Sequence, residues 1–353
     1  MRGAAPDTVR DARRRGDALP GTAGFAGRLD GALVRDVLGR EPLFSAADDP
    51  DAWSHDPTDL ADPERVPAGH ARDATGDRRL WTLPDPPPAD PDDALDGVRS
   101  ALLASVDGAD ADAVAFSGGV DSALVAAGLP DVPCYVTGFE GAPDVARAHE
   151  AAAALDRDLR VVALDHDDLR RVVRAVVAAT GRTNAMDVAI AATLYPTAAA
   201  AAADGHDSLA FGQGADELFG GYAKVARLDD RVAADTVRGA VRETVRDLPD
   251  GLERDVLAIR AAGVDPVLPL LHDRVVAAAL ALPADLLVDR EADERKVALR
   301  RVARERVGAA ADADKKAAQY GSYVARELDR MARRDGYKRR MDDHVRRYVE
   351  SLV

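Results

Sequence analysis

The middle of the chain alternates between short apolar runs and longer segments in which apolar residues recur with helical spacing. The apolar runs, which we expect to form buried strands, are Ala113–Phe116, Cys134–Phe139, Leu159–Leu164 and Ser208–Phe211. The segments that we expect to form helices are Ser122–Ala127, Asp144–Ala154, Leu169–Ala179 and Asp187–Ala203. This alternation predicts an α/β fold with a doubly wound parallel sheet, whose ligands bind at the carboxyl ends of the strands.

The pattern differs on the N-terminal side of this region. Residues 1–20 are polar, and we expect a disordered arm there. The segment 24–83 is rich in Asp, Pro and Gly, and 84–91 contains five prolines, which indicates a stiff linker. The apolar spacing of Leu95–Val106 predicts a helix.

On the C-terminal side, the strand pattern stops after Tyr222. We expect a helical extension formed by residues 223–245, 252–262, 273–282, 295–307, 322–334 and 341–353. The sequence therefore predicts two domains. Residues 1–90 hold the arm, the loop-rich segment and the linker, and residues 91–353 hold the α/β domain with its helical extension.

Composition narrows the classes of function. The 353 residues carry a formal net charge of −15, which disfavours a surface for nucleic acid or for an anionic membrane. Acidic residues are abundant and lysine is scarce, as in halophilic proteins, so the charge is also explained by a salty habitat. The lysines are Lys224, Lys296, Lys315, Lys316 and Lys338.

Other bulk features point to a cytoplasmic protein. The single cysteine, Cys134, lies in an apolar run, and it excludes an internal disulfide or a cysteine-based zinc site. No apolar run approaches the length of a membrane span. Residues 1–15 are rich in arginine but lack the apolar core of a secretory signal.

A glycine-rich turn, Ser117–Ser122, connects the first predicted strand to the first predicted helix. Backbone amides in such a turn can face an anion at the helix N-terminus, and the two serines add hydroxyl donors. Asp121 would repel a phosphate unless a cation lay between them, so its presence suggests Mg²⁺. The lysine of the commoner phosphate-binding loop is absent.

Two motifs carry a resemblance to a known family. S-G-G-V-D-S at 117–122 resembles the pyrophosphate loop of the ATP pyrophosphatase superfamily, whose fold is of the adenine nucleotide alpha hydrolase type. G-Q-G-A-D-E-L-F-G-G-Y at 212–222 resembles the signature of the asparagine synthetase synthase domain. The resemblance implies Mg-ATP as substrate and Asp121 and Asp216 on the metal–pyrophosphate unit. The nucleotide-contacting residues that it implies are Phe116, Ser117, Gly118, Gly119, Val120, Asp121, Ser122, Phe211 and Gly212.

Two further segments resemble parts of the same family. Residues 138–144 resemble a segment that packs beside the adenosine, so the backbone at Val136, Thr137 and Gly138 is expected to meet the adenine. Asp144 has two interpretations, a helix N-cap or a residue of the site, and the N-cap is favoured. Lys315 and Lys316 resemble a late segment in which a lysine contacts pyrophosphate. Spacing does not choose between them, and a solvated pair at a helix end is the alternative.

The N-terminal part resembles the end of the glutaminase domain found in this family. The matching segments are Val34–Phe44 and Val66–His70. The family's catalytic cysteine follows the initiator methionine, and Arg2 holds that position here. The resemblance therefore implies a vestigial, β-rich glutaminase-like segment at 24–83 and ammonia as nitrogen donor, with a separate glutaminase subunit left open.

Two departures affect the expected reaction, which by resemblance joins aspartate and ammonia with ATP to give asparagine, AMP and pyrophosphate. Arg254 and Asp255 match the family, but Val267 replaces an arginine and Gln213 replaces a glutamate near the adenylate. An amide carries no charge and accepts no proton. The alternatives are therefore an enzyme that adenylates another metabolite or an RNA base, for which Arg333–Arg347 offers a basic stripe, or a non-catalytic ATP-binding regulator.

Overall fold

The structure is a computed structural model that describes residues 1–129, 131–312 and 318–353. The chain divides into two compact units that interleave in sequence. The sheet unit comprises residues 110–211, 254–267 and 307–353, and the N-terminal unit comprises residues 1–109, 212–253 and 268–306. The expected domain boundary near residue 90 is a division of another kind, and it stays a prediction.

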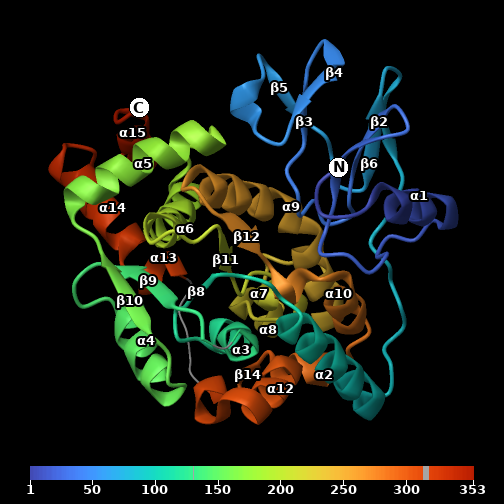
Figure 1. Cartoon of the computed structure of the whole chain (residues 1–353). Coiled ribbons are helices and arrows are strands. Elements are labelled where there is room, and N and C mark those ends of the chain that lie inside the picture. The colour runs from blue at the N-terminus through green and yellow to red at the C-terminus, as the bar shows by residue number, and fades with distance from the viewer. Residues whose placement is uncertain (130, 313–317) are drawn as a thin grey trace. The chain divides into compact units, whose positions relative to one another are not determined.

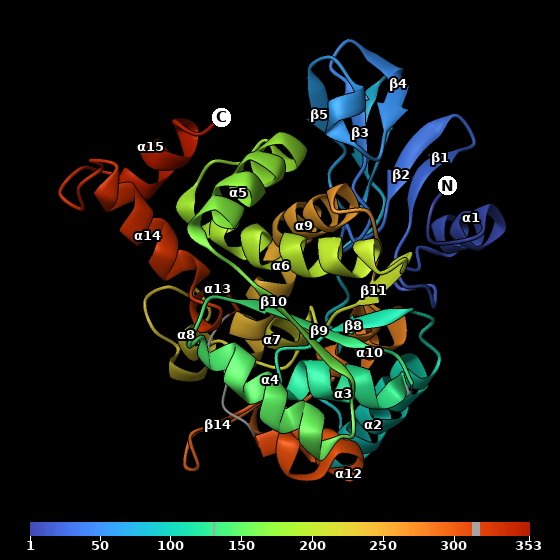
Figure 2. The ribbon, with the colours of Figure 1, turned by 60° about the vertical axis from the view of Figure 1, so that its left-hand side comes forward.

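A five-stranded parallel sheet forms the centre of the sheet unit, which confirms the α/β fold (Figure 1). Helix α6 covers one face of the sheet, and α3 and α4 cover the other (Figure 2). The strand order is β10 (Leu159–Ala163), β9 (Cys134–Gly138), β8 (Ala113–Ala115), β11 (Ser208–Ala210) and β12 (Asp265–Val267). The helices between the strands are α3 (Val120–Gly128), α4 (Pro143–Ala154), α5 (His166–Thr180) and α6 (Ala185–Ala203).

Strand β12 corrects our expectation that no strand follows Tyr222. It pairs in parallel with β11, with Ser208 opposite Asp265 and Ala210 opposite Val267. Pro266 hides this strand in the sequence because proline cannot donate a hydrogen bond to a ladder. The proline is tolerated because β12 is the last strand in the sheet order.

The outer layer of the sheet unit is helical. Helices α13 (Ala318–Gly321), α14 (Val324–Arg334) and α15 (His344–Glu350) pack with α6, and Met331, Tyr348 and Val349 join its apolar core. A 3-10 turn, η3 (Gly308–Asp312), contacts α3. Within the described residues, α6 is long and apolar enough to cross a membrane, but it packs against β9 and α5, as a core helix does.

The N-terminal unit begins with a helix where we expected a disordered arm. Helix α1 (Pro6–Arg15) has proline in its first turn and ends at Gly16, whose φ is 67°. Val9 and Ala12 lie on one side of the helix and are buried in an apolar cluster with Phe25 and Trp81. The expectation was wrong because two apolar residues among many charges are enough to dock a short helix.

Two small antiparallel sheets follow α1, as expected from the resemblance of this part to a glutaminase domain. One has the order β1 (Ala26–Leu29), β2 (Ala32–Arg35), β6 (His70–Asp73) and β7 (Gly76–Arg79). The other has the order β4 (Asp49–Ser54), β3 (Phe44–Ala46) and β5 (Pro63–Arg65), with a 3-10 turn η1 (Pro57–Asp59) between β4 and β5.

The rest of the N-terminal unit is mainly helical. Its elements are α2 (Pro91–Asp107), α7 (Ala215–Leu218), α8 (Ala223–Arg227), η2 (Pro269–Leu271), α10 (Asp273–Leu280), α11 (Ala284–Leu287), the hairpin β13 (Val288–Asp289) and β14 (Glu294–Arg295), and α12 (Val297–Val307). Helix α9 (Val237–Ala261) runs from this unit into the sheet unit. It continues through Pro249, so our expectation of a break between residues 245 and 252 was wrong.

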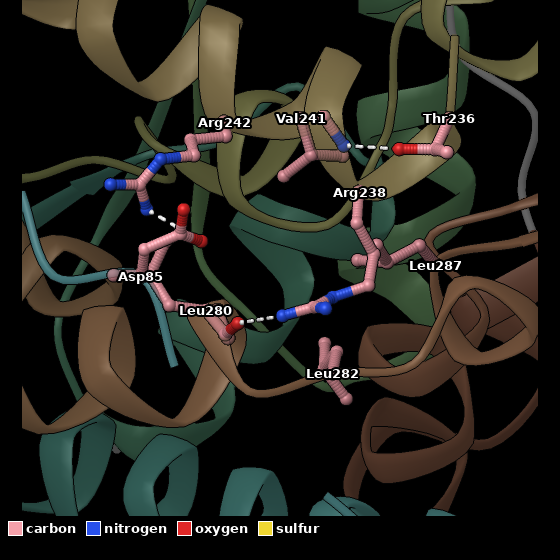
Figure 3. Close-up of a pocket in the computed structure, with 10 residues that line it drawn as sticks. Asp85, Thr236, Arg238, Val241, Arg242, Leu280, Leu282 and Leu287 are labelled. Carbon is pink, nitrogen blue, oxygen red and sulfur yellow. Dashed lines mark hydrogen bonds and ion pairs between the residues drawn. The ribbon is translucent and has the colours of Figure 1, made fainter. Parts of the chain in front are cut away.

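The proline-rich linker is held by two arginines one turn apart on α9. Figure 3 shows Arg242 beside Asp85 and Arg238 beside Leu280. Arg242 donates to the carbonyl oxygens of Leu83, at 2.6 Å, and Pro84, and Arg238 donates to those of Pro86, at 2.8 Å, and Leu280, at 3.1 Å. The two side chains line a cavity of about 250 Å³. Asp85, the linker residue that lines this cavity, lies 3.3 Å from Arg242, so the two arginines are taken up by the linker and by the Leu280 carbonyl.

We expect Arg242→Ala to lower the free energy of unfolding by about 2–3 kcal/mol, because it removes charged donors from two carbonyls. Urea unfolding followed by circular dichroism measures the loss. Arg246→Ala, at an exposed position one turn further along α9, is the matched control and should change stability by less than about 0.5 kcal/mol. Equal losses in the two variants would contradict the clamp.

Candidate functional site

The predicted pyrophosphate loop lies between β8 and α3 in the sheet unit. Gly118 has φ +70°, and Gly119 is the N-cap of α3, without a side-chain capping bond. The amides of the first turn of α3 therefore have no side-chain cap, which suits an anion at this helix end. Ser122 Oγ donates to the Gly119 carbonyl at 3.1 Å and lies 3.4 Å from Ser117 Oγ. Asp121 is buried in the same turn.

Gly118 packs directly on the backbone of α4. A Cβ at this position would lie 2.6 Å from the carbonyl oxygen of Arg147 and 2.8 Å from the amide nitrogen of Ala148. Both the positive φ and the close approach therefore require glycine. The neighbouring Val120 and Phe116 are buried, so they can offer a nucleotide only backbone atoms.

The end of β9 lies beside β8, on the same carboxyl edge of the sheet. The Gly138 carbonyl accepts from the Leu164 amide at 3.1 Å, and the Phe139 amide donates to the Ser322 carbonyl at 3.1 Å. Thr137 Oγ1 lies 2.8 Å from Thr197 Oγ1 on α6, and Val136 is buried. The carboxyl end of β9, which is expected to meet the adenine, is thus held by hydrogen bonds with Leu164 and with Ser322. Its contact with a base stays a prediction.

Asp144 is not the N-cap of α4, which corrects the favoured interpretation. Ala142 occupies that position and Pro143 begins the helix, so Asp144 lies in the first turn. Its carboxylate is buried and accepts a bond from Arg147 Nη1 at 2.7 Å. A Cβ on Gly321 would lie 2.1 Å from Asp144 Oδ2, so the carboxylate packs against that glycine. Lys315 and Lys316, a few residues before Gly321, lie outside the described residues.

The second motif starts directly after β11 and belongs to the N-terminal unit. Phe211, the last residue of the sheet unit before it, is buried and donates its amide to the Val267 carbonyl at 2.9 Å. Gly212 and Gln213 are partly exposed. Gly214, with φ +90°, is the N-cap of α7, and Asp216 lies in the first turn of that helix.

Asp216 forms an ion pair with Lys296, a residue that the sequence analysis missed. Lys296 Nζ lies 2.7 Å from Asp216 Oδ1, and Lys296 is 7% exposed with φ +60°. A Cβ on Gly221 would lie 1.9 Å from Asp216 Oδ1 and 2.4 Å from Lys296 Cε. Gly221, the last glycine of the motif, therefore makes room for this pair. The scarcity of lysine, which drew attention to 315 and 316, could have drawn it to Lys296.

The acidic residue beside Asp216 is affected by the same charges. Burial, and next the negative charge of Asp216, raise the pKa of Glu217 to about 7. The hydroxyl of Tyr222, which donates to Glu217 Oε1, and the charge of Lys296 oppose this shift.

A metal at either motif would need ligands beyond the protein. Within the described residues, no group of three or more histidine, cysteine or acidic side chains is arranged to hold a metal ion. Mg²⁺ in nucleotide enzymes is held by one or two carboxylates together with phosphate oxygens and water. The residues present therefore fit Mg²⁺ that is bound together with ATP.

Arg254 and Asp255, which match the family, form a buried ion network with α6 in the sheet unit. Arg254 donates to Asp187 Oδ1 at 2.7 Å and to Asp255 Oδ1 at 2.8 Å. Arg182 also pairs with Asp187, at 3.0 Å. This network fixes the start of α6 against the end of α9.

Two other sequence-based candidates are also placed. Cys134 is fully buried in β9, and burial raises the pKa of its thiol to about 11, so it is protonated at neutral pH and does not act as a nucleophile. In the basic stripe, Arg333 and Arg339 pair with Asp329, and Arg346 pairs with Glu350. Three basic side chains of the stripe are thus paired with acidic residues within the protein.

Comparison with known proteins agrees with the fold and the motifs. Residues 97–256 match the family described as Asparagine synthase. The chain is also 31% identical, over 193 residues, to a Methanocaldococcus jannaschii protein named "Putative asparagine synthetase (glutamine-hydrolyzing) 1". The match covers 53% of this chain and 36% of that relative, so it spans about a third of the relative's length. Residues 97–256, somewhat less than half of the chain, are thus similar to the asparagine synthase family, in agreement with the parallel sheet and the two motifs.

Proposed function

We propose that the chain is an ATP-dependent, AMP-forming carbon–nitrogen ligase that converts a carboxylate into an amide. The observation that carries the proposal is the turn at 117–122. Helix α3 starts there without a side-chain cap, and the space at Gly118 leaves no room for a side chain. Such a turn suits the phosphates of a nucleotide. The family match covers this turn and the second motif.

Each motif contributes a carboxylate to the proposed reaction. Asp121 and Asp216 are the residues that would hold Mg²⁺ bound with the pyrophosphate part of ATP. When bound, the ion supplies positive charge to the phosphate oxygens. Lys296 neutralises Asp216 at 2.7 Å and orients its carboxylate. Lys315 or Lys316 is the proposed cation on the departing pyrophosphate.

The reaction proceeds in two steps. A carboxylate oxygen of the substrate attacks the α-phosphorus of ATP, the bond to the bridging oxygen breaks, and pyrophosphate leaves. Ammonia then attacks the acyl carbon, the bond to AMP breaks, and an amide forms after loss of a proton. Aspartate is the carboxylate that we propose first, on the resemblance to the family.

The proposed nitrogen donor is free ammonia. The chain has one cysteine, and its buried, protonated thiol in β9 does not supply the nucleophile that glutamine hydrolysis requires. A separate glutaminase subunit could deliver ammonia in the cell. Amide formation from ammonium but not from glutamine by the purified chain supports this part of the proposal, whereas release of glutamate from glutamine would contradict it.

Exchange of labelled pyrophosphate into ATP, measured with a panel of amino acids and other carboxylates, tests the proposal. Exchange that depends on aspartate alone supports the asparagine-forming reaction. Exchange with a different carboxylate keeps the ligase chemistry and changes the substrate. Binding of ATP without exchange in the presence of any carboxylate would favour the alternative function, a non-catalytic ATP-binding regulator.

Replacement of Gln213 by glutamate separates these outcomes further, because the partly exposed Gln213 stands where the family usually has glutamate. If aspartate is the substrate, we expect Gln213→Glu to raise aspartate-dependent exchange. If another acceptor is used, the added charge should weaken ATP binding, by up to a few kcal/mol at an effective dielectric of about 20. Exchange kinetics would show the gain of activity in the first case, and calorimetric ATP titration would show the loss of affinity in the second. No change in either measurement would mean that Gln213 does not line the site.

A further inference from the structure

We propose that the N-terminal β-rich part is retained because it positions the second nucleotide motif, with Arg40 as the positioning residue. The proposed path runs from Arg40 through the turn η2 to Gly214, and every residue in it belongs to the N-terminal unit. Its consequence for activity rests on the proposed function, but the contacts themselves do not.

Arg40 is the centre of a buried ion network. It is 2% exposed, and its guanidinium contacts three groups. Nε donates to Asp36 Oδ1 at 2.9 Å, and Nη2 lies 2.8 Å from Asp273 Oδ1 at the start of α10. Nη1 donates to the carbonyl oxygen of Leu271 at 2.7 Å. A single side chain thus joins the glutaminase-like segment to η2 and α10.

The two carboxylates around Arg40 are fixed in turn by their own strands and turns. Asp36 accepts the backbone amides of Phe25, at 3.2 Å, Leu38, at 3.0 Å, and Arg40, at 3.1 Å. Asp273 accepts the amide and the hydroxyl of Thr22 at 2.7 and 3.1 Å. Residues 22–40 therefore form a rigid frame around the guanidinium, because each charged group has several fixed partners.

The turn η2 transmits this frame to the motif. The Leu271 side chain packs against Gly214 so closely that a Cβ there would lie 2.3 Å from Leu271 Cδ2. Ser105 Oγ on α2 donates to the Pro269 carbonyl at 2.6 Å and holds the other end of the turn. Gly214 is the N-cap of α7, the helix that carries Asp216. Displacement of Leu271 would therefore free the start of α7.

This arrangement gives the segment Val34–Phe44, which resembles part of a glutaminase, a structural role of its own. Arg35, beside the network, is also fully buried and donates to the carbonyl oxygens of Gly39, Glu41 and Val66. Arg35 and Arg40, in the segment that resembles a glutaminase, thus bind backbone carbonyls and neighbouring turns and helices. In the proposal, these contacts help to position α7.

Hydrogen exchange of the full-length, ligand-free chain tests the proposal. Arg40→Lys keeps the charge but loses the fork of donors that reaches Asp36, Leu271 and Asp273 together. We expect amide exchange in residues 212–222 to become faster, on the order of tenfold, in this variant. The matched control is Leu33→Ala, which removes a buried side chain from β2 in the same unit. The control should leave exchange in 212–222 unchanged at a comparable loss of urea midpoint.

A second variant keeps the test decisive if Arg40→Lys does not fold. Leu271→Ala removes the side chain that touches Gly214 and leaves the ion network intact, and it should accelerate exchange in the same residues. Unchanged exchange at 212–222 in the folded variants, or equal acceleration in Leu33→Ala, overturns the positioning role. If amide exchange at 212–222 is accelerated only in these two variants, the positioning role stands. It stands even if the wild-type chain shows no pyrophosphate exchange, a result that would reject the proposed ligase activity.

Discussion

Asp121→Asn and Asp216→Asn are each expected to lower ATP–pyrophosphate exchange by about 10²–10³-fold, the range for loss of one group that stabilises charge in a transition state. Each substitution removes a negatively charged oxygen ligand from the proposed Mg²⁺ site. Asp121 lies in the first turn of α3, and Asp216 lies in the first turn of α7. Steady-state exchange at saturating ATP, with folding checked by circular dichroism, measures the effect.

The two variants should differ in their side effects. Asp216→Asn removes the negative charge that pairs with Lys296 at 2.7 Å, and with it a charge that raises the pKa of Glu217. The pKa of Glu217 should therefore fall in this variant, and carbon NMR of the labelled side chain follows it. Asp167→Asn, an exposed acid in the first turn of α5, is the control and should keep full exchange. Wild-type exchange in both site variants would contradict the assignment.

The sheet could be predicted because its pattern is local. Four of its five strands are apolar runs, such as Cys134–Gly138, and the turns between strands and helices carry glycines at the carboxyl edge. The fifth strand, β12, contains Pro266 and three residues only, so neither propensity nor length signals it. Its assignment depends on pairing with β11, which is a contact between distant parts of the chain.

The parts of the candidate site that could not be predicted depend on tertiary contacts. Lys296 is 80 residues from Asp216 in sequence, and only the fold brings the two charges together. Asp144 preceded a helical pattern in an N-cap-like position, but Pro143 already starts α4, and the carboxylate turns inward to Arg147. The expectation of a disordered arm at residues 1–20 was wrong for a similar reason, because the burial of Val9 depends on residues near 25 and 81.

Gly118→Ala should lower pyrophosphate exchange by about 10²-fold, because a shift of the order of 1 Å in a positioned group costs this much. The new Cβ would lie 2.6 Å from the Arg147 carbonyl oxygen and 2.7 Å from its carbon, and helix backbone cannot move aside as a flexible side chain can. The loop must therefore move away from α4, and the amides of α3 move with it.

The control for Gly118→Ala is Gly181→Ala at the end of α5. Gly181 has φ +66°, close to the +70° of Gly118, but a Cβ there would meet nothing within 4 Å. Both variants bear the left-handed backbone cost of about 1–2 kcal/mol, which urea unfolding measures. Only Gly118→Ala should also lose ATP affinity in calorimetric titration. If the two variants bound ATP equally well, the turn at 117–122 would not be the phosphate site, because its close fit against Arg147 would then have no bearing on the nucleotide.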